Sequence, residues 1–371
     1  MNKHFYKFSF ATFLSLLGDQ LTLVAFPWLL MKLSNEPWII GMALGLIGLP
    51  RALAILAGGV LTDRYDTRKL LITSRLASGV IMSIMVALLV FDTLSLSIFI
   101  LLAFFLGLTS ALGMPATPTF IASLLGEDEA KVKAGNGVIL GIAQIAGLLG
   151  PIIAGFLLSY FSNAELTLSF DGFIIIFVVD MMTFFLAAIT IYQIKTQASS
   201  NKAEESFKKS FFEGLAFLRE RKFLIILFSY LALINFVVHG SVLVGLPILV
   251  KEHMGATPQL YGSLMTVCGL GALFAFGSAK LVPSIPLEKY FTILALIDLV
   301  TAGLIYSFVS VEFGWLSFVI LFSIGFIGGL IQLNTFSLLQ TKVEERFRGR
   351  MISFFMFSVF GLIPISSSIT G

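Results

Sequence analysis

The sequence predicts an all-α membrane protein whose helices cross a lipid bilayer many times. Of its 371 residues, 57% are hydrophobic and only 12% are charged, whereas a soluble domain carries about 25% charged residues. The mean hydropathy is +0.99, and the apolar residues form runs long enough to span a bilayer, which takes about 20 residues in a helix. A single cysteine, Cys268, excludes a disulfide framework and a multi-cysteine metal site.

Eleven apolar runs are long enough to be spans. The first follows basic residues, as in a signal peptide, but it continues without a small-residue cleavage site, so we expect it to remain as a helix. The last run ends with the sequence itself, from which we expect a truncated eleventh helix and a missing twelfth; a natural eleven-span protein is the alternative. The runs are 8–32, 38–61, 70–91, 95–122, 134–160, 171–193, 222–250, 258–282, 289–310, 314–339 and 350–371.

The positive charges predict the orientation of these spans. With the N-terminus in the cytoplasm, 21 of the 24 Lys and Arg residues lie on the cytoplasmic side. Lys32 and Lys251 then lie outside, and Arg51 lies within the membrane. An excess of Lys and Arg in cytoplasmic loops is the usual determinant of topology. We therefore expect a multi-pass protein of the cell membrane, plasma or inner, with a cytoplasmic N-terminus.

A polar stretch at 195–221 divides the chain into an N-terminal six-helix half, 1–194, and a C-terminal half, 222–371, truncated in helix 11. The halves show a weak repeat, since Thr119-Phe120 corresponds to Thr335-Phe336, and duplicated halves are one transporter architecture. The polar stretch is expected to be a solvated cytoplasmic linker, or to contact anionic lipid headgroups through its basic residues Lys208, Lys209, Arg219, Arg221 and Lys222.

The loop after the second span carries a spaced motif. A glycine is followed four residues later by Asp-Arg and then by a basic pair. This pattern resembles the signature cytoplasmic loop of the major facilitator superfamily, although Asp66 stands where that family has a second glycine. The resemblance implies a cytoplasmic gate, with Asp63 meeting the start of the last helix near residues 349–351. The motif residues are Gly59, Asp63, Arg64, Arg68 and Lys69.

The fifth span is rich in small residues around one proline. Small residues allow helices to approach closely, and a proline removes a backbone donor and permits a bend. The spacing is similar to the antiporter motif of the superfamily's exporters, with alanine at two positions; an ordinary packing face is the alternative. The residues of this motif are Gly137, Gly150, Pro151 and Gly155.

Further segments resemble one branch of the superfamily, the transmembrane secretion effector group with its macrolide-efflux and siderophore-export proteins. They are Leu17-Gly18-Asp19-Gln20, Leu49-Pro50-Arg51 and Phe347-Arg348-Gly349-Arg350-Met351. This resemblance covers the whole chain. It implies a major-facilitator fold of two six-helix halves and export of a drug-like or secondary-metabolite molecule by alternating access. It also implies proton antiport, with a proton gradient as the energy source and no cofactor.

Ionisable residues inside the membrane need an explanation, because each costs about 2.5–3.5 kcal/mol on insertion scales. Asp19 and Arg51 both lie about eleven residues, or about 16 Å, from the cytoplasmic end of their spans at 1.5 Å per residue. They are expected to pair. The pair is either a static link or a site where Asp19 carries the coupling proton and Arg51 modulates its pKa; a role in substrate binding is a third interpretation.

Other polar residues in the spans divide into two groups. By resemblance, spans 1, 4, 7 and 10 line a central cavity, which makes His239, Asn235, Gln332 and Asn334 cavity candidates. Asp180 and Asp298 lie on spans that are peripheral in the family, so structural pairing is expected for them. Arg75 is expected to extend to the cytoplasmic surface.

Three functions compete with export. A nutrient or solute symporter would share the fold. A membrane-embedded enzyme is disfavoured because the sequence contains no clustered metal ligands, no nucleophile beside a base and no phosphate-binding loop. A non-transporting scaffold or inactive fragment is the third. We expect a monomer that binds a small molecule within the lipid bilayer, with no metal and no nucleic acid.

Overall fold

The computed structural model describes most of the chain. The described residues are 1–34, 36, 38–46, 48–50, 65–113, 116–126, 128–161, 170–194, 207–253, 257–278, 289–310 and 314–370. Within these ranges the chain is helical or in turns, with no strand. The prediction of an all-α fold is thus confirmed.

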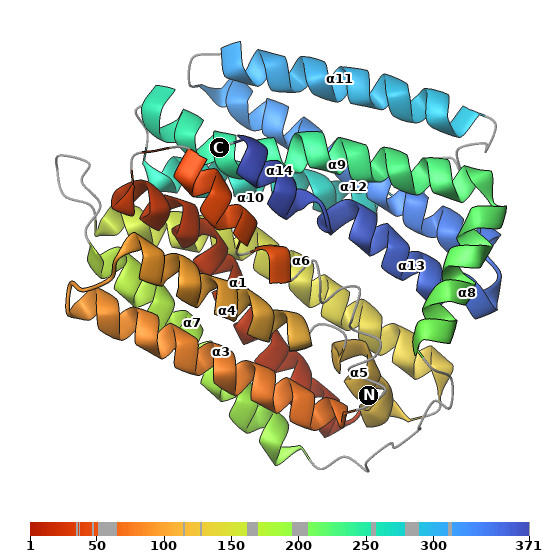
Figure 1. Ribbon diagram of the computed structural model, residues 1–371, viewed down its shortest axis with the longest axis horizontal. Helices are drawn as coiled ribbons and strands as arrows, with labels where there is room; N and C mark the ends of the chain where they lie inside the picture. Colours follow the sequence, from red (N-terminus) through yellow and green to blue (C-terminus); the bar gives the residue numbers. More distant parts are fainter. Residues whose placement is uncertain are drawn as a thin grey trace.

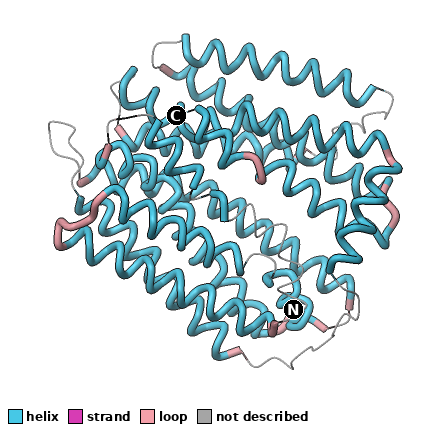
Figure 2. Tube along the Cα trace, viewed as in Figure 1, coloured by secondary structure: helices cyan, strands magenta, loops and turns pink. Residues whose placement is uncertain are grey.

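Long helices lie side by side through the molecule and run in alternating directions (Figure 1), and the described residues outside them form turns and short loops (Figure 2). A short helix, Trp38–Pro50, precedes α3. The others are α1 (Lys3–Leu33), α3 (Thr67–Val90), α4 (Leu96–Gly113), α5 (Ala116–Leu125), α6 (Glu129–Tyr160), α7 (Phe170–Gln193), α8 (Phe207–Glu220), α9 (Lys222–Ile248), the π-helical turn η1 (Leu249–His253), α10 (Pro258–Gly277), α11 (Tyr290–Ser310), α12 (Trp315–Lys342), α13 (Glu345–Phe360) and α14 (Ile363–Thr370).

The helices agree closely with the predicted spans. Among the described residues, nine helices are long and apolar enough to cross a membrane. The predicted span 38–61 is described only as far as residue 50, and the predicted span 95–122 consists of α4 and α5. Helices α1 and α6 begin about a turn before their apolar runs, because Asn2 and Asp128 cap them by accepting hydrogen bonds from backbone N–H groups.

The up-and-down topology places the starts of α1, α3, α6 and α9 at one end of the bundle, together with the chain's N-terminus (Figure 1). We call this the N-terminal end. The ends of the same helices reach the opposite end. Helices α1–α7 form the lower part of the bundle in this view and α9–α14 the upper part, with α6 and α10 between them.

Three buried apolar clusters hold the bundle together. The largest includes Leu29, Phe177, Val244 and Leu264, so it joins α1–α7 to α9–α14 at the opposite end. The other two clusters lie at the N-terminal end. Among the described residues, one of these two clusters contains only residues of α1–α7 and their connections. The other contains only residues of α8–α13 and their connections. The two groups of helices are therefore joined by apolar packing mainly at the opposite end.

The polar linker contains a helix that the sequence analysis did not predict. Helix α8 packs against the start of α13, where Phe217 stacks on Phe347 with ring centroids 4.1 Å apart. Glu213 and Arg350 form an ion pair of 3.0 Å, and Arg221 pairs with Glu344 at 2.6 Å. The end of α8 is therefore packed rather than fully solvated, since Phe217 is only 5% exposed, while Phe212 remains 62% exposed.

Candidate functional site

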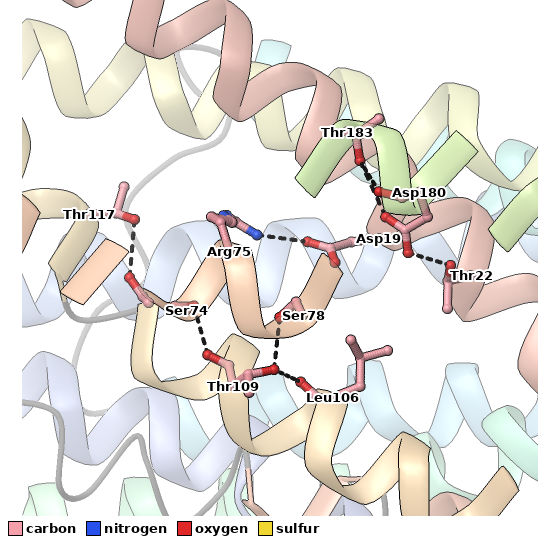
Figure 3. Close-up of polar contacts among 11 residues, drawn as sticks. Asp19, Thr22, Ser74, Arg75, Ser78, Leu106, Thr109, Thr117, Asp180 and Thr183 are labelled. Carbon is pink, nitrogen blue, oxygen red and sulfur yellow. Dashed lines mark hydrogen bonds and ion pairs between the residues drawn. The ribbon is translucent and has the colours of Figure 1, made fainter. Parts of the chain in front are cut away.

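Asp19 on α1 and Arg75 on α3 form an ion pair in the interior of the bundle (Figure 3). The distance between Asp19 Oδ2 and Arg75 Nη1 is 3.8 Å, and the two side chains are 25% and 15% exposed. Arg75 was expected to extend to the surface, but its guanidinium group turns toward Asp19. The partner expected for Asp19, Arg51, lies outside the described residues.

A second carboxylate lies beside this pair. Asp180 on α7 is fully buried. The Thr22 hydroxyl donates a hydrogen bond of 2.5 Å to Asp180 Oδ2, and the Thr183 hydroxyl lies 3.4 Å from Oδ1 (Figure 3). Asp180 also interacts electrostatically with Asp19 and Arg75. Three helices thus bring two carboxylates, one guanidinium group and two hydroxyls together.

Gly18 makes this arrangement possible. A Cβ atom at this position would collide with Asp180 Oδ1 and would lie 2.6 Å from Thr183 Oγ1. Only glycine therefore lets α1 approach α7 closely enough for Thr22 to reach Asp180. In a membrane, small residues at helix contacts serve this purpose.

Hydroxyl groups close to Arg75 in the sequence hold α3 against α4. Ser74, the neighbour of Arg75, donates a hydrogen bond of 2.7 Å to the backbone carbonyl of Thr109, and Ser78 lies 2.7 Å from the Thr109 hydroxyl. Ser78 is fully buried. These bonds fix α3 against α4 (Figure 3), so the Arg75 side chain starts from a rigid backbone.

Two contacts in the small-residue motif of α6 join it to other helices. A Cβ at Gly150 would collide with Gln20 of α1, and one at Gly155 would lie 2.6 Å from the carbonyl oxygen of Pro258 in α10. Gly137 is different, because it is exposed and nothing lies within 4 Å of an added Cβ. In the predicted motif, Gly150 and Gly155 therefore lie at helix contacts, whereas Gly137 does not.

Helix α10 provides the surface that packs against this motif of α6. A Cβ at Gly262 would collide with the carbonyl oxygen of Pro151. The Thr266 hydroxyl donates a hydrogen bond of 3.1 Å to the backbone carbonyl of Leu148. This contact lies near the opposite end of the bundle and joins α1–α7 to α9–α14.

The predicted gate motif is described only in part, since Gly59, Asp63 and Arg64 lie outside the described residues. Arg68 donates a hydrogen bond of 3.3 Å to the carbonyl of Ile191 at the end of α7 and another to that of Tyr192. A cation at a helix C-terminus is favourable. Lys69 follows in the same first turn of α3.

Asp66, which stands where the family has a glycine, has a structural role at the start of α3. Its Oδ1 accepts hydrogen bonds of 2.9 Å from the Arg68 N–H and 3.1 Å from the Lys69 N–H. Asp66 is thus the N-cap of α3, and aspartate is among the residues preferred there.

The polar cavity candidates are scattered over α9 and α12. The side-chain amides of Asn235 and Asn334 donate hydrogen bonds to carbonyls of their own helices, Leu231 and Leu330, at 2.8 and 2.9 Å. Gln332 is half-buried. The side chain of His239 lies outside the described part of the structure. The described geometry gives none of these candidates a contact with Asp19.

A family model described as Major Facilitator Superfamily matches residues 8–367. The chain belongs to this superfamily. The match covers nearly the whole sequence, so the fold that the sequence motifs implied is confirmed. Membership identifies the chain as a multi-pass membrane transporter.

Curated relatives of this major-facilitator chain include exporters. The enterobactin exporter EntS of Shigella boydii serotype 4 is 27% identical over 150 residues, which cover 40% of this chain and 35% of that protein. The EntS protein of Salmonella typhimurium is also 27% identical over 150 residues, or 40% of this chain and 36% of that protein. The match thus spans about a third of the length of these relatives.

Solved structures of the superfamily share the fold over almost the whole chain. A nucleoside transporter, NupG, has a TM-score of 0.76 at 14% identity and covers 99% of this chain and 90% of that one. A D-xylose-proton symporter has a TM-score of 0.75 at 13% identity, with 99% and 89% coverage. A bacterial homologue of the human lysosomal transporter Spinster has a TM-score of 0.72 at 15% identity, with 98% and 82% coverage.

The proximity of Asp180 to Asp19 was not predicted from the sequence, and Arg75 was expected to lie at the surface. One signal was available. Asp180 lies 13 residues before the end of α7 and Asp19 lies 16 residues after the start of α1, so both fall well inside the bundle from the same end. Asp298, the other expected structural acid, has one carboxylate oxygen buried without a hydrogen-bond partner among the described residues.

Proposed function

We propose that this chain is a secondary active transporter that exports a small molecule by alternating access, driven by proton antiport. The superfamily match carries the proposal of transport. Export as the direction of transport is supported by the similarity to enterobactin exporters and by the exporter-type motif of α6. The chain works as a monomer, and the proton gradient is its energy source.

The distribution of apolar packing supports alternating access. The largest cluster joins the two groups of helices at the end opposite the N-terminus, whereas each described cluster at the N-terminal end belongs to one group. If the N-terminus is cytoplasmic, as the Lys and Arg residues predict, the arrangement corresponds to a state closed toward the outside. In the proposed cycle Asp63 and the other gate residues close the cytoplasmic side.

The proposed substrate is a drug-like molecule or a secondary metabolite such as a siderophore. The helices α9 and α12 contribute Asn235, Gln332 and Asn334 as candidate contacts, with His239 as a fourth. Hydrogen-bonding amides among apolar side chains suit a large molecule with few charges. Asp19 is the proposed proton carrier, with Arg75 as the charged partner that the described residues provide.

The test measures accumulation in energised bacterial cells that express the chain. The probes are ethidium, erythromycin and enterobactin, each with and without a proton uncoupler. Export predicts that expression lowers the accumulation of at least one probe and that the uncoupler restores it. Raised accumulation would indicate a symporter, and unchanged accumulation of every probe would contradict export of these classes.

A variant pair tests the proton carrier. Asp19→Asn is expected to abolish uncoupler-sensitive export while the protein still reaches the membrane. Asp171→Asn, an exposed acid at the start of α7, serves as the control and should export normally. Uphill export that survives in Asp19→Asn would rule out Asp19 as the carrier.

A further inference from the structure

The cluster of Asp19, Arg75 and Asp180 contains more acid than base. Two carboxylates share one guanidinium group, so the cluster carries a net charge of −1 when both acids are ionised. Among the described residues, the ionisable groups near Asp180 on the packed helices are Asp19 on α1 and, beyond Asp19, Arg75 on α3 (Figure 3). On α6, which also contacts α7, residues 134–159 include no ionisable side chain.

An unbalanced charge is costly at this position. Asp180 is fully buried within a helix that crosses the membrane, and a buried carboxylate without a compensating charge is strongly disfavoured. Arg75 already contacts Asp19 at 3.8 Å, so it balances only one of the two acids. A bound proton on the carboxylate pair would make the cluster neutral.

We propose that Asp180 and Asp19 together hold one exchangeable proton, with Asp180 as its main binding site and Arg75 as the shared counter-charge. This site refines the proposed function, because the proton assigned there to Asp19 is shared by two carboxylates, and it rests on that function for the link to transport. It places the coupling proton at the junction of α1, α3 and α7. When the proton leaves, Arg75 must serve two carboxylates instead of one, which couples proton release to the packing of these three helices.

The polar groups around Asp180 fit a proton better than a sodium ion. The Thr22 hydroxyl donates its hydrogen to Asp180 Oδ2 at 2.5 Å. The Thr183 hydroxyl donates to the backbone carbonyl of Asp180 at 2.7 Å. The Thr22 hydroxyl therefore presents a hydrogen atom rather than a lone pair to the carboxylate, so in this arrangement it is not a cation ligand.

One face of α1 offers a route for the proton. Ser9, Thr12, Ser15, Asp19 and Thr22 follow one another at spacings of three or four residues, so they share a face of the helix. Ser15 is fully buried and Ser9 is 6% exposed. Among the described residues, both hydroxyl oxygens lack a hydrogen-bond partner. Such groups are suited to bind water, and the face leads from Asp19 toward the N-terminal end.

The test is infrared difference spectroscopy on the purified full chain in detergent micelles, which needs no substrate. Acidification should produce the C=O stretching band of a protonated carboxylic acid in the wild type. Asp180→Asn should lose this band, and Asp171→Asn, the control on the same helix, should keep it. Asp19→Asn should also lose the band at the same pH, although Asp180 is present, because Arg75 alone then balances the remaining acid.

Several outcomes would overturn the proposal. They are a wild type without the band, an unchanged band in Asp180→Asn, and an Asp19→Asn spectrum identical to that of the wild type. Removal of the band by sodium chloride, but not by choline chloride at the same pH, would indicate a sodium site instead. If Asp180→Asn does not fold, Thr22→Val replaces it, because loss of the hydroxyl donor should shift the frequency of the band; an unshifted band contradicts the assignment.

The infrared and transport results separate the two proposals. A band with the expected variant pattern in a chain that exports none of the probes would reject export and retain the proton site. Uncoupler-sensitive export without the band would reject this site alone.

Discussion

The contact between α6 and α10 leaves no room for a side chain at Gly262, so its substitution is a direct test of the packing. A Cβ there would collide with the carbonyl oxygen of Pro151 and would lie 3.0 Å from its carbonyl carbon and 3.2 Å from the Cα of Gly155. All three are backbone atoms, which cannot rotate away as a flexible side chain would. Gly262→Ala must therefore push the two helices apart.

The magnitude follows from two opposing effects. Overpacking of a well-packed contact costs about 1–3 kcal/mol, while alanine gains about 1 kcal/mol over glycine in a helix interior. Gly262→Ala should therefore lower the free energy of unfolding by up to about 2 kcal/mol. Gly137→Ala is the matched control, since nothing lies within 4 Å of its added Cβ, and it should be neutral or stabilising.

The assay is reversible unfolding of both variants in detergent micelles, followed by tryptophan fluorescence. The difference between them isolates the overpacking term of about 1–3 kcal/mol, because both changes are glycine to alanine in a helix. Cys268, the chain's single cysteine, lies on α10 and provides a second readout. Its labelling by a maleimide should be faster in Gly262→Ala. Equal stability of the two variants would refute the close contact between α6 and α10.

Three further predictions concern the connections of the bundle. Asp66→Ala should lower the stability of α3 by about 1 kcal/mol through loss of its N-cap, whereas Asp66→Gly should cost only a few tenths of a kcal/mol; thermal unfolding compares the two. Glu213→Gln should cost less than about 1 kcal/mol, because its ion pair with Arg350 is partly exposed, and a double-mutant cycle with Arg350→Gln measures the coupling. Asp63→Asn should slow transport without lowering expression, and wild-type transport rates would contradict a gating role for this residue.

The sequence was sufficient to predict most of the helices. An apolar run of about 20 residues specifies a membrane-spanning helix almost by itself, because every backbone polar group must be satisfied internally in lipid. Boundaries were less predictable, as α1 and α6 show. Their first turns are polar and continue the helix beyond the apolar run, so hydropathy alone cannot locate their starts.

Helix α8 was missed for a different reason. Its segment is polar overall, so it was expected to be part of the linker. A local pattern was available, because Phe207, Phe211, Leu215 and Leu218 follow at spacings of four, four and three residues. This is the period of an amphipathic helix, so the pattern predicts that the segment is helical.

The proton site could be predicted only in part. Asp19 was identified because an acid in an apolar run is conspicuous, but its lateral neighbours depend on which helices pack side by side. Hydropathy gives the depth of a residue and not the direction that it faces. The contact of Gly18 with Asp180 fixes that direction, and it arises from tertiary packing between α1 and α7.

Contacts such as Gly155 with Pro258, and Gly262 with Pro151, affect how easily such a molecule can change shape. Helices that meet backbone to backbone can slide apart without disentangling side chains and without leaving large voids behind. One elementary charge moved through a membrane potential of 100 mV releases about 2.3 kcal/mol. A backbone-to-backbone contact of this kind keeps the free energy needed to separate the helices comparable to the energy that one proton releases. Deeply interlocked side chains would raise that free energy and hold the molecule in one conformation.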